Sequence, residues 1–228
     1  MTGADDSRRT PRRATAPRER QVDADRTRAA LLDAALEEFA AKGYAGARVR
    51  DIAARAGVSK DLIAYHFGGK DGLYLAVQRA WLDRRAGFTE PGRPLAETIA
   101  DYLHDALRDP RPMRLLAWRG LATGGPPPPD ASAPDDHPGV DSMRRRQDAG
   151  EIGADLDPAT LQLALLGAVA APVVFGGLAR GLFGAAPGDP AFERRYRAGL
   201  QQLLAALAPH PDQDTAEASR TITDDASA

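Results

Sequence analysis

The residues most suited to binding chemistry lie between Arg48 and Phe67, in the stretch RVRDIAARAGVSKDLIAYHF. Its lysine, serine and tyrosine are side chains that contact phosphates and the edges of bases in nucleic acids. Such contacts require a rigid element that presents the side chains together. The pattern is typical of two short helices joined by a tight turn, a helix-turn-helix whose second helix enters a major groove. We therefore expect double-stranded DNA to be the partner of this segment.

The turn is predicted from a glycine that interrupts an apolar stripe. Ile52, Ala53 and Ala56 recur at helical spacing, and Gly57 follows where a helix should end. A glycine at this boundary adopts a positive φ without a Cβ clash, and Val58 can then pack back onto the preceding turn. The small side chain of Ala53 allows the two helices to cross closely.

The second helix is expected to open at Ser59, whose hydroxyl can accept a hydrogen bond from an unpaired backbone N–H. Asp61 in the first turn suits the positive end of the helix dipole. Ile63 and Phe67 form the inward face of this helix. The residues left to point elsewhere are Lys60, Asp61, Leu62, Ala64 and Tyr65.

Short motifs on both sides extend this pattern. They are Lys42-Gly43-Tyr44, Val49-Arg50-Asp51-Ile52-Ala53, Ala56-Gly57-Val58-Ser59, Tyr65-His66-Phe67 and Lys70-Asp71-Gly72-Leu73-Tyr74. With them, residues 26–74 closely resemble the N-terminal domain of TetR-family (AcrR-like) transcriptional regulators. The resemblance implies an all-α fold, with an N-terminal three-helix helix-turn-helix DNA-binding domain and a C-terminal helical domain for ligand binding and dimerisation. It also implies a regulator, by default a repressor, and not an enzyme.

The resemblance and the helix pattern together place nine residues at the DNA. They are Arg48, Ser59, Lys60, Asp61, Leu62, Ala64, Tyr65, His66 and Lys70. Members of the family often have a hydroxyl residue at Arg48, glycine at Asp61, threonine or serine at Leu62 and an aromatic residue at Ala64, so the family's base preferences do not carry over. Asp61 either caps its helix or accepts a hydrogen bond from a cytosine amino group, and we favour the cap. Lys70 is expected to hold a phosphate.

The composition sets the class of molecule. The chain has 228 residues, 43% of them apolar, which is enough for one or two domains with a core, and no long apolar run predicts a membrane span. There is no cysteine, so disulfides, thiolate chemistry and cysteine zinc sites are excluded. The first residues lack the apolar core of a secretion signal. We expect a cytoplasmic protein without a cofactor or metal.

The formal net charge of −2 conceals a gradient along the chain. Residues 7–20 contain six arginines and one glutamate, a local net charge of +5, whereas residues 209–228 contain five acids and one arginine, a net charge of −4. Both ends have few bulky apolar side chains. We therefore expect a disordered basic arm at 1–25 and a disordered acidic tail at 209–228. The arm is either a solubilising tail or a segment that contacts phosphates or a minor groove.

Helical periodicity continues through the rest of the chain. The first helix, at 26–42, covers the helix-turn-helix, and after the break at Gly68-Gly69 a connecting helix spans 70–87. Further helices are expected at 95–108, 112–123, 158–182 and 189–207. A proline-rich loop is expected at 124–138, followed by a helix that ends at Ala149. Helix 158–182 is apolar enough to be buried all round, and Pro172 should kink it. The domains are thus 26–75 for DNA binding and 76–208 for ligand binding and dimerisation.

The last two predicted helices, 158–182 and 189–207, carry more apolar surface than one small domain can cover. In TetR-like proteins the corresponding pair forms a four-helix dimer interface, and the small residues Gly167, Ala168, Ala170 and Ala171 would permit close approach. A monomeric core is the alternative. We favour a homodimer, because a two-fold protein suits a palindromic operator.

An unknown small-molecule effector is the remaining expected partner. Large or flexible side chains are candidates to line its pocket, although any one of them is more often plain core. They are Trp81, Phe88, Tyr102, Met113, Trp118, Met143 and Phe175.

Two other functions compete with this interpretation. A metal-dependent enzyme could use Asp101, His104 and Asp105, but acid and histidine side chains at this spacing are more often a solvated helix surface. An architectural or ligand-independent DNA-binding protein would have no need of the second helical domain, which favours a sensor.

Overall fold

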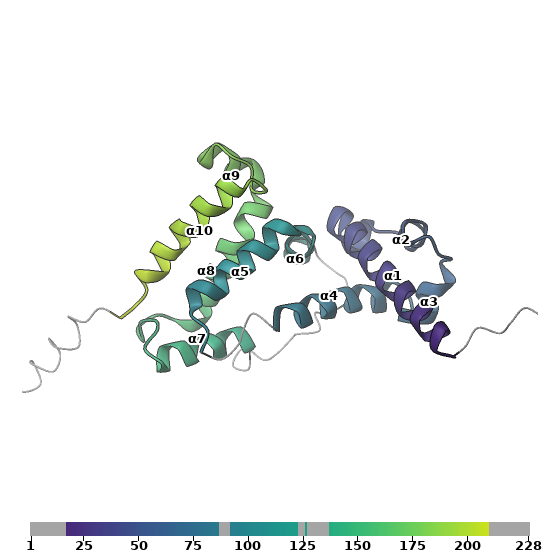
Figure 1. Ribbon diagram of the computed structural model, residues 1–228, viewed down its shortest axis with the longest axis horizontal. Coiled ribbons are helices and arrows are strands. Elements are labelled where there is room, and N and C mark those ends of the chain that lie inside the picture. The colour runs from purple at the N-terminus through teal and green to yellow at the C-terminus, as the bar shows by residue number, and fades with distance from the viewer. Residues whose placement is uncertain (1–16, 87–91, 123–125, 127–136, 210–228) are drawn as a thin grey trace, which may run out of the picture.

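The computed structural model describes residues 17–86, 92–122, 126 and 137–209. Within these residues every regular element is a helix, in agreement with the predicted all-α class. Figure 1 shows α1, α2 and α3 at one end and α5–α10 at the other, with α4 running between them. The helices are α1 (Pro17–Gly46), α2 (Val49–Ala56), α3 (Asp61–Phe67), α4 (Lys70–Ala86), α5 (Leu95–Arg108), α6 (Arg111–Leu121), α7 (Pro138–Asp148), α8 (Pro158–Val174), α9 (Gly176–Phe183) and α10 (Pro190–Ala205).

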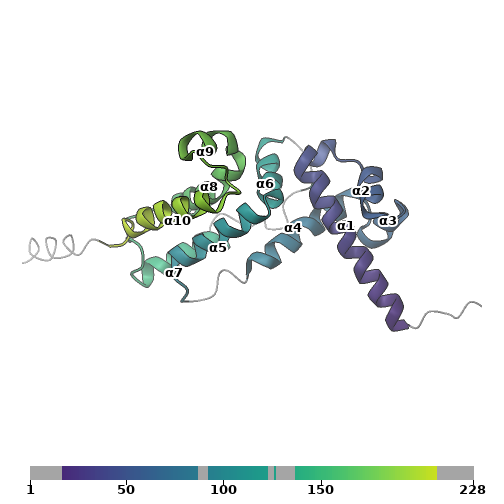
Figure 2. The same ribbon diagram turned by 45° about the horizontal axis from the view of Figure 1, so that its top comes forward.

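The first helix begins earlier than its sequence pattern indicated. Pro17 starts α1, so residues 17–25 are helical and their assignment to a disordered arm was wrong. Proline is well suited to a first helical position, and the side chain of Gln21 donates to Asp25 one turn later at 3.0 Å. Figure 2 shows this part of α1 extending beyond the α2–α3 pair. The rest of the predicted arm and the acidic tail, from residue 210, lie outside the described residues.

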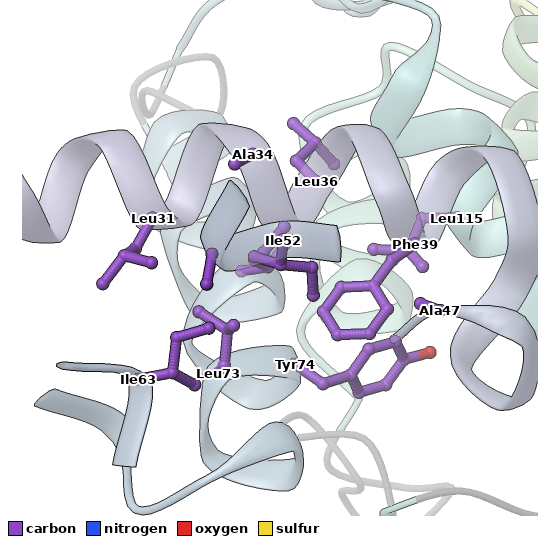
Figure 3. Packing of buried hydrophobic residues seen from close by; sticks show 13 residues of the cluster. Leu31, Ala34, Leu36, Phe39, Ala47, Ile52, Ile63, Leu73, Tyr74 and Leu115 are labelled. Atoms are coloured by element: carbon purple, nitrogen blue, oxygen red, sulfur yellow. The ribbon is translucent and has the colours of Figure 1, made fainter. Parts of the chain in front are cut away.

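The N-terminal core joins side chains from α1, α2, α3 and α4. Phe39 is fully buried and meets the ring of Tyr74 edge to face at 5.0 Å between centroids. Ile52, Ile63 and Leu73 are equally buried, and Figure 3 shows their side chains in the same cluster as Phe39. Burial of these side chains fixes α2 and α3 against α1, since the hydrophobic free energy scales with the apolar area removed from water.

A second core fills the space among α5, α6, α7, α8 and α10. Its buried members include Leu103, Met113, Met143, Leu165 and Leu200. Two of the helices around it begin with side-chain caps, because the Asp157 side chain accepts from the Thr160 N–H at 2.8 Å and the Asp189 side chain from the Ala191 N–H at 2.7 Å. The described residues therefore form two hydrophobic cores, and the predicted domain bounds stay a prediction.

The apolar segment at 158–182 forms two helices, not one kinked helix. α8 ends at Val174, and α9 leaves it at 87° after Phe175. Pro172 has no N–H to donate to the carbonyl of Ala168 one turn earlier. The hydroxyl of Tyr196 on α10 supplies the missing donor, at 2.8 Å from that carbonyl oxygen. The proline therefore creates a gap in the helical hydrogen bonding that a tyrosine of the neighbouring helix fills.

The prediction that this segment is buried all round was wrong for the single chain. Leu163 is 70% exposed and Leu182 is 66% exposed, although Leu165 and Val169 are buried. Periodicity could not show this, because nearly every position in the segment is small or apolar. Among the described residues no individual helix has the length and apolarity of a membrane span, and α8 and α9 reach that composition only when the bent pair is taken together.

The Tyr196 hydrogen bond gives a prediction for stability. Tyr196→Phe should lower the free energy of unfolding by about 1 kcal/mol, because the carbonyl of Ala168 loses its donor, and urea titration measures the loss. In a Pro172→Ala background the restored backbone N–H can bond to that carbonyl, so Tyr196→Phe should cost less there. Equal costs in the two backgrounds would contradict the role assigned to Tyr196.

Candidate nucleic-acid interface and cavity

The turn between α2 and α3 has the geometry that the sequence predicted. Gly57 adopts φ 69° and its N–H bonds to the carbonyl of Ala54 at 3.2 Å, while the N–H of Val58 bonds to the carbonyl of Ala53 at 3.0 Å. These two hydrogen bonds end α2 at a residue in the left-handed backbone conformation, which favours glycine. It sets the angle at which the chain enters α3.

The start of α3 differs from the prediction. The helix begins at Asp61, and no side chain caps it, so the cap expected from Ser59 and favoured for Asp61 is absent. The backbone takes this role instead, because the carbonyl of Ser59 accepts from the N–H of Leu62 at 3.2 Å. The hydroxyl of Ser59 is therefore not used in capping, and Asp61 lies exposed in the first turn, where a negative charge suits the helix dipole.

The two faces of α3 are clearly separated. Ile63 is fully buried, whereas Tyr65 is 82% exposed and its ring meets the edge of His66 at 5.0 Å between centroids. Leu62, expected to face outward, is half-buried and packs against the N-terminal core. Phe67, expected to be core, is only half-buried, with the guanidinium of Arg28 5.3 Å from its ring centroid.

The exposed residues of the predicted DNA set lie on or beside α2 and α3. Arg48 precedes α2, Lys60 precedes α3, and Ala64 and Tyr65 lie on α3 itself. His66 and Lys70 are half-buried, and both keep part of their surface accessible. A short helix with one buried and one exposed face is the element that a groove reader requires.

Lys70 is positioned by two residues that the sequence analysis had not assigned a role. Its ammonium lies 4.5 Å from the centroid of the Tyr44 ring, and the Tyr44 hydroxyl donates to the carboxylate of Asp71. That hydrogen bond, with partial burial, raises the pKa of Tyr44 to about 12. Gly72 allows the close junction of α3 and α4, since a Cβ there would lie 1.8 Å from the carbonyl oxygen of Phe67. Lys70 is thus held at the N-terminus of α4, where a phosphate would be favoured.

Comparison with known proteins identifies the family. The model of the family described as bacterial regulatory proteins, tetR family, matches residues 31–77. The HTH-type transcriptional repressor SCO4008 of Streptomyces coelicolor is 33% identical over 151 residues, which cover 65% of this chain and 78% of that protein. The chain belongs to the TetR family.

Other relatives in the comparison agree with this assignment. The HTH-type transcriptional regulator RutR of Escherichia coli is 39% identical over 116 residues, which cover 47% of this chain. The match spans about half of RutR's length, 53%. The crystal structure of SCO4942 from Streptomyces coelicolor covers 81% of this chain and 99% of its own, with a TM-score of 0.63 and 24% identity. That neighbour shows that the TetR-like fold extends over both groups of helices, α1–α3 with the start of α4 (the N-terminal body) and α5–α10 (the second body).

The second body of this TetR-family chain contains a cavity of about 540 Å³ among α4, α5, α6, α7 and α8. Trp81, Tyr102 and Met143 line it, so three of the seven candidate residues are brought together. Met113 is buried in the adjacent core, and Phe175 is 59% exposed after α8. Phe88 lies outside the described residues. The volume is in the range of small-molecule sites.

Trp118, the remaining candidate, points toward the N-terminal body instead of the cavity. Its indole N–H donates to the carbonyl of Ala40 on α1 at 3.1 Å. A Cβ on Gly43 would lie 3.1 Å from the indole ring, so the ring rests against the glycine backbone. Trp118 is thus not among the residues that line this cavity, and its side chain is 41% exposed beside α1, because an aromatic residue in the sequence does not reveal which neighbours it packs against.

The side chains considered for a metal site do not converge. His104 Nδ1 lies 2.9 Å from a carboxylate oxygen of Glu193 on α10, and Asp101 pairs with Arg93. The part of the chain that the structure describes holds no group of three histidine or acidic residues arranged for a metal ion. The names of the family and of its relatives indicate a transcriptional regulator.

The separation of faces on α3 can be tested by stability. Ile63→Ala should lower the free energy of unfolding by about 2–5 kcal/mol, because it leaves a cavity in the N-terminal core. Tyr65→Ala should leave the unfolding midpoint nearly unchanged, because the ring is mostly in water. Urea titrations of both variants decide the point, and a large loss for Tyr65→Ala would show that its ring is structural.

Proposed function

We infer that this TetR-family protein is a ligand-responsive transcriptional repressor that binds a palindromic DNA operator as a homodimer. The observation that carries the proposal is α3, which presents Tyr65 outward while Ile63 anchors its opposite face in the core. Lys60 before α3 and Lys70 after it supply positive charge at both ends of the exposed face. Base contacts from α3 and phosphate contacts from the lysines would together give specificity and affinity.

The exposed apolar surface of α8, α9 and α10 supports dimerisation. Leu163, Phe175, Leu178, Leu182 and Leu203 are all more than half exposed. Large exposed apolar surfaces often mark interaction sites in soluble proteins. A Cβ on Gly167 would meet no atom within 4 Å, which leaves room beside α8 for a helix of a second copy.

The cavity supports a response to a small molecule. Its wall includes Trp81 and Leu82 of α4 and Leu116 of α6. α4 leads directly to Lys70 and the N-terminal core, and α6 reaches the same core through Leu115. An effector that repacks this wall would displace both helices, and through them the spacing of the two α3 helices in a dimer. An architectural DNA-binding protein would have no use for such a cavity.

Selection of bound DNA tests the proposal as a whole. Purified protein should retain genomic fragments that share two inverted half-sites, with centres about 34–36 Å apart or a multiple of one helical turn. Sequencing of the retained fragments measures both the motif and the spacing. Single half-sites without a partner would contradict the dimer, and fragments without any shared motif would contradict the repressor.

Lys70 is expected to hold a phosphate and not to read a base. Lys70→Ala should weaken binding to operator variants by a similar factor and lower the slope of log affinity against log salt by about one unit. The control is Arg114→Ala, an exposed cation on α6 in the second body, which should change neither quantity. A loss for Lys70→Ala confined to one base position would assign it to base reading.

A further inference from the structure

We propose that Asp61 reads a base, and that its carboxylate accepts a hydrogen bond from the amino group of one cytosine in each half-site of the operator. The inference rests on the proposed function, because it names the base that one residue of α3 selects when that helix lies in a major groove. The sequence allowed two uses of this carboxylate, a helix cap or an acceptor for cytosine. The contacts of Asp61 in the protein distinguish the two.

Asp61 lies on the exposed face of α3. It is the first residue of the helix, and Ala64 and Tyr65 follow it one turn later; all three are exposed. Residues three and four positions apart share one face of an α-helix. Ile63, in contrast, is fully buried in the N-terminal core. Asp61 therefore belongs to the same surface as Tyr65, on which the proposed DNA contact depends.

The backbone N–H groups at the start of α3 are bonded without the Asp61 side chain. The N–H of Leu62 bonds to the carbonyl of Ser59 at 3.2 Å, and the N–H of Ile63 bonds to the carbonyl of Lys60 at 3.1 Å. No side chain caps the helix. Capping is therefore not the role of this carboxylate.

Other acidic side chains close to the α2–α3 pair have partners within the protein. Asp51 lies 3.1 Å from Nε of Arg50, and Asp71 accepts from the Tyr44 hydroxyl. The carboxylate of Asp61 forms no hydrogen bond or ion pair with any residue that the structure describes. An acid without a partner on a surface that faces DNA repels the phosphates, so it weakens binding unless the DNA supplies a hydrogen-bond donor.

Only two bases offer a donor to a carboxylate in the major groove. They are cytosine and adenine, through their amino groups, whereas guanine and thymine present acceptors there. Adenine carries the acceptor N7 beside its amino group, and this lone pair would repel the second carboxylate oxygen. The neighbour of the cytosine amino group is a C–H, which does not repel it. Cytosine is therefore the base that suits Asp61.

The position and size of Asp61 also suit a base contact. In helix-turn-helix proteins the first residues of the recognition helix are those that reach base edges. Aspartate is short, so the contact requires a close approach of α3, and Ala64 adds only a methyl group to the same face. Lys60 is exposed immediately before Asp61, and its positive charge offsets repulsion between the carboxylate and nearby phosphates.

A change of one side-chain group tests the base preference. Fragments that the wild-type protein retains from a randomised DNA library should carry cytosine at one position of each half-site. Asp61→Asn keeps the shape of the side chain, and asparagine pairs with N6 and N7 of adenine, so this variant should shift the preference to adenine at that position alone. Asp61→Ala should lose the preference there. Sequencing of the retained fragments measures all three results.

Asp83→Asn is the matched control. Asp83 is an exposed aspartate near the C-terminal end of α4, so this variant makes the same change of charge away from α3. It should leave the preferred base unchanged at every position. Both aspartates are exposed, so neither asparagine variant should shift the unfolding midpoint in a urea titration.

A nucleotide without the amino group tests the hydrogen bond itself. Replacing the selected cytosine by 2-pyrimidinone, which is cytosine without its 4-amino group, should weaken binding of the wild-type protein about tenfold per half-site. The same replacement should cost Asp61→Ala much less, because that variant has no acceptor for the amino group. Any weakening of the base pair is common to both proteins and cancels. Fluorescence anisotropy titrations give the four affinities of this cycle.

Three results would overturn the assignment. Equal losses for the wild-type protein and Asp61→Ala on the 2-pyrimidinone operator would show that no hydrogen bond joins the two groups. Tighter binding of Asp61→Ala to every sequence, with base preferences unchanged, would show that Asp61 acts only through its charge. A wild-type preference for an A·T pair at the position that responds to Asp61 would show that cytosine is the wrong base.

The proposed function is decided separately, by the wild-type protein alone. If the wild-type protein retains fragments without a shared motif, the proposed function and this inference both fail. If it retains a shared motif that neither Asp61 variant alters, this inference alone fails.

Discussion

The contact between α6 and α1 holds the two helical bodies in one arrangement. Leu115 of α6 is buried in the N-terminal core, and the indole of Trp118 donates to the carbonyl of Ala40. Gly43 makes this possible, because its φ of 67° interrupts α1 and its missing Cβ lets the indole approach. Carbonyl groups near a helix interruption need donors from elsewhere, and Trp118 is such a donor. The α3 surface therefore has a defined position relative to the cavity.

An ion-pair cluster at the start of α6 reinforces the same contact. Arg111 donates to Asp109 at 2.8 Å and to Asp33 of α1 at 2.9 Å. The hydrogen bond from Arg111 holds the pKa of Asp109 below its ordinary value, so the pair stays charged through the neutral range. Asp33 is largely exposed, and exposed ion pairs contribute little to stability. The cluster thus orients α6, while Leu115 is the side chain of α6 that is buried in the N-terminal core.

The sequence predicted where the helices begin and end better than it predicted which side chains they pack against. Gly57 and Gly68-Gly69 marked the breaks correctly, because a positive φ strongly favours glycine. The predicted helix starts at 158 and 189 are within one residue of those in the structure, where Asp157 and Asp189 cap the helices through local hydrogen bonds. The start of α1 was missed, because the composition of residues 1–25 predicts disorder. In the structure residues 17–25 are helical, and the side chain of Gln21 donates to Asp25 one turn later. Trp118 and Phe175 were misplaced, since an apolar side chain can be buried in either core or left exposed. Capping of α3 by Ser59 failed because the backbone of the turn satisfied the same N–H groups.

The short helix α6 contributes side chains to both hydrophobic cores and to the cavity wall, so the cavity wall and the N-terminal body cannot move independently of each other. Met113 lies in the second core, Leu115 in the first, and Leu116 and Arg119 in the cavity wall. Burial raises the pKa of Tyr74 in the first core, and the charge of Arg119 acts against that rise, so the two groups are electrostatically linked. Packed helices move as rigid bodies, since close-packed side chains do not deform independently. A displacement of the cavity wall at Leu116 would therefore act on the same helix that carries Leu115 and Trp118, without touching α3 itself.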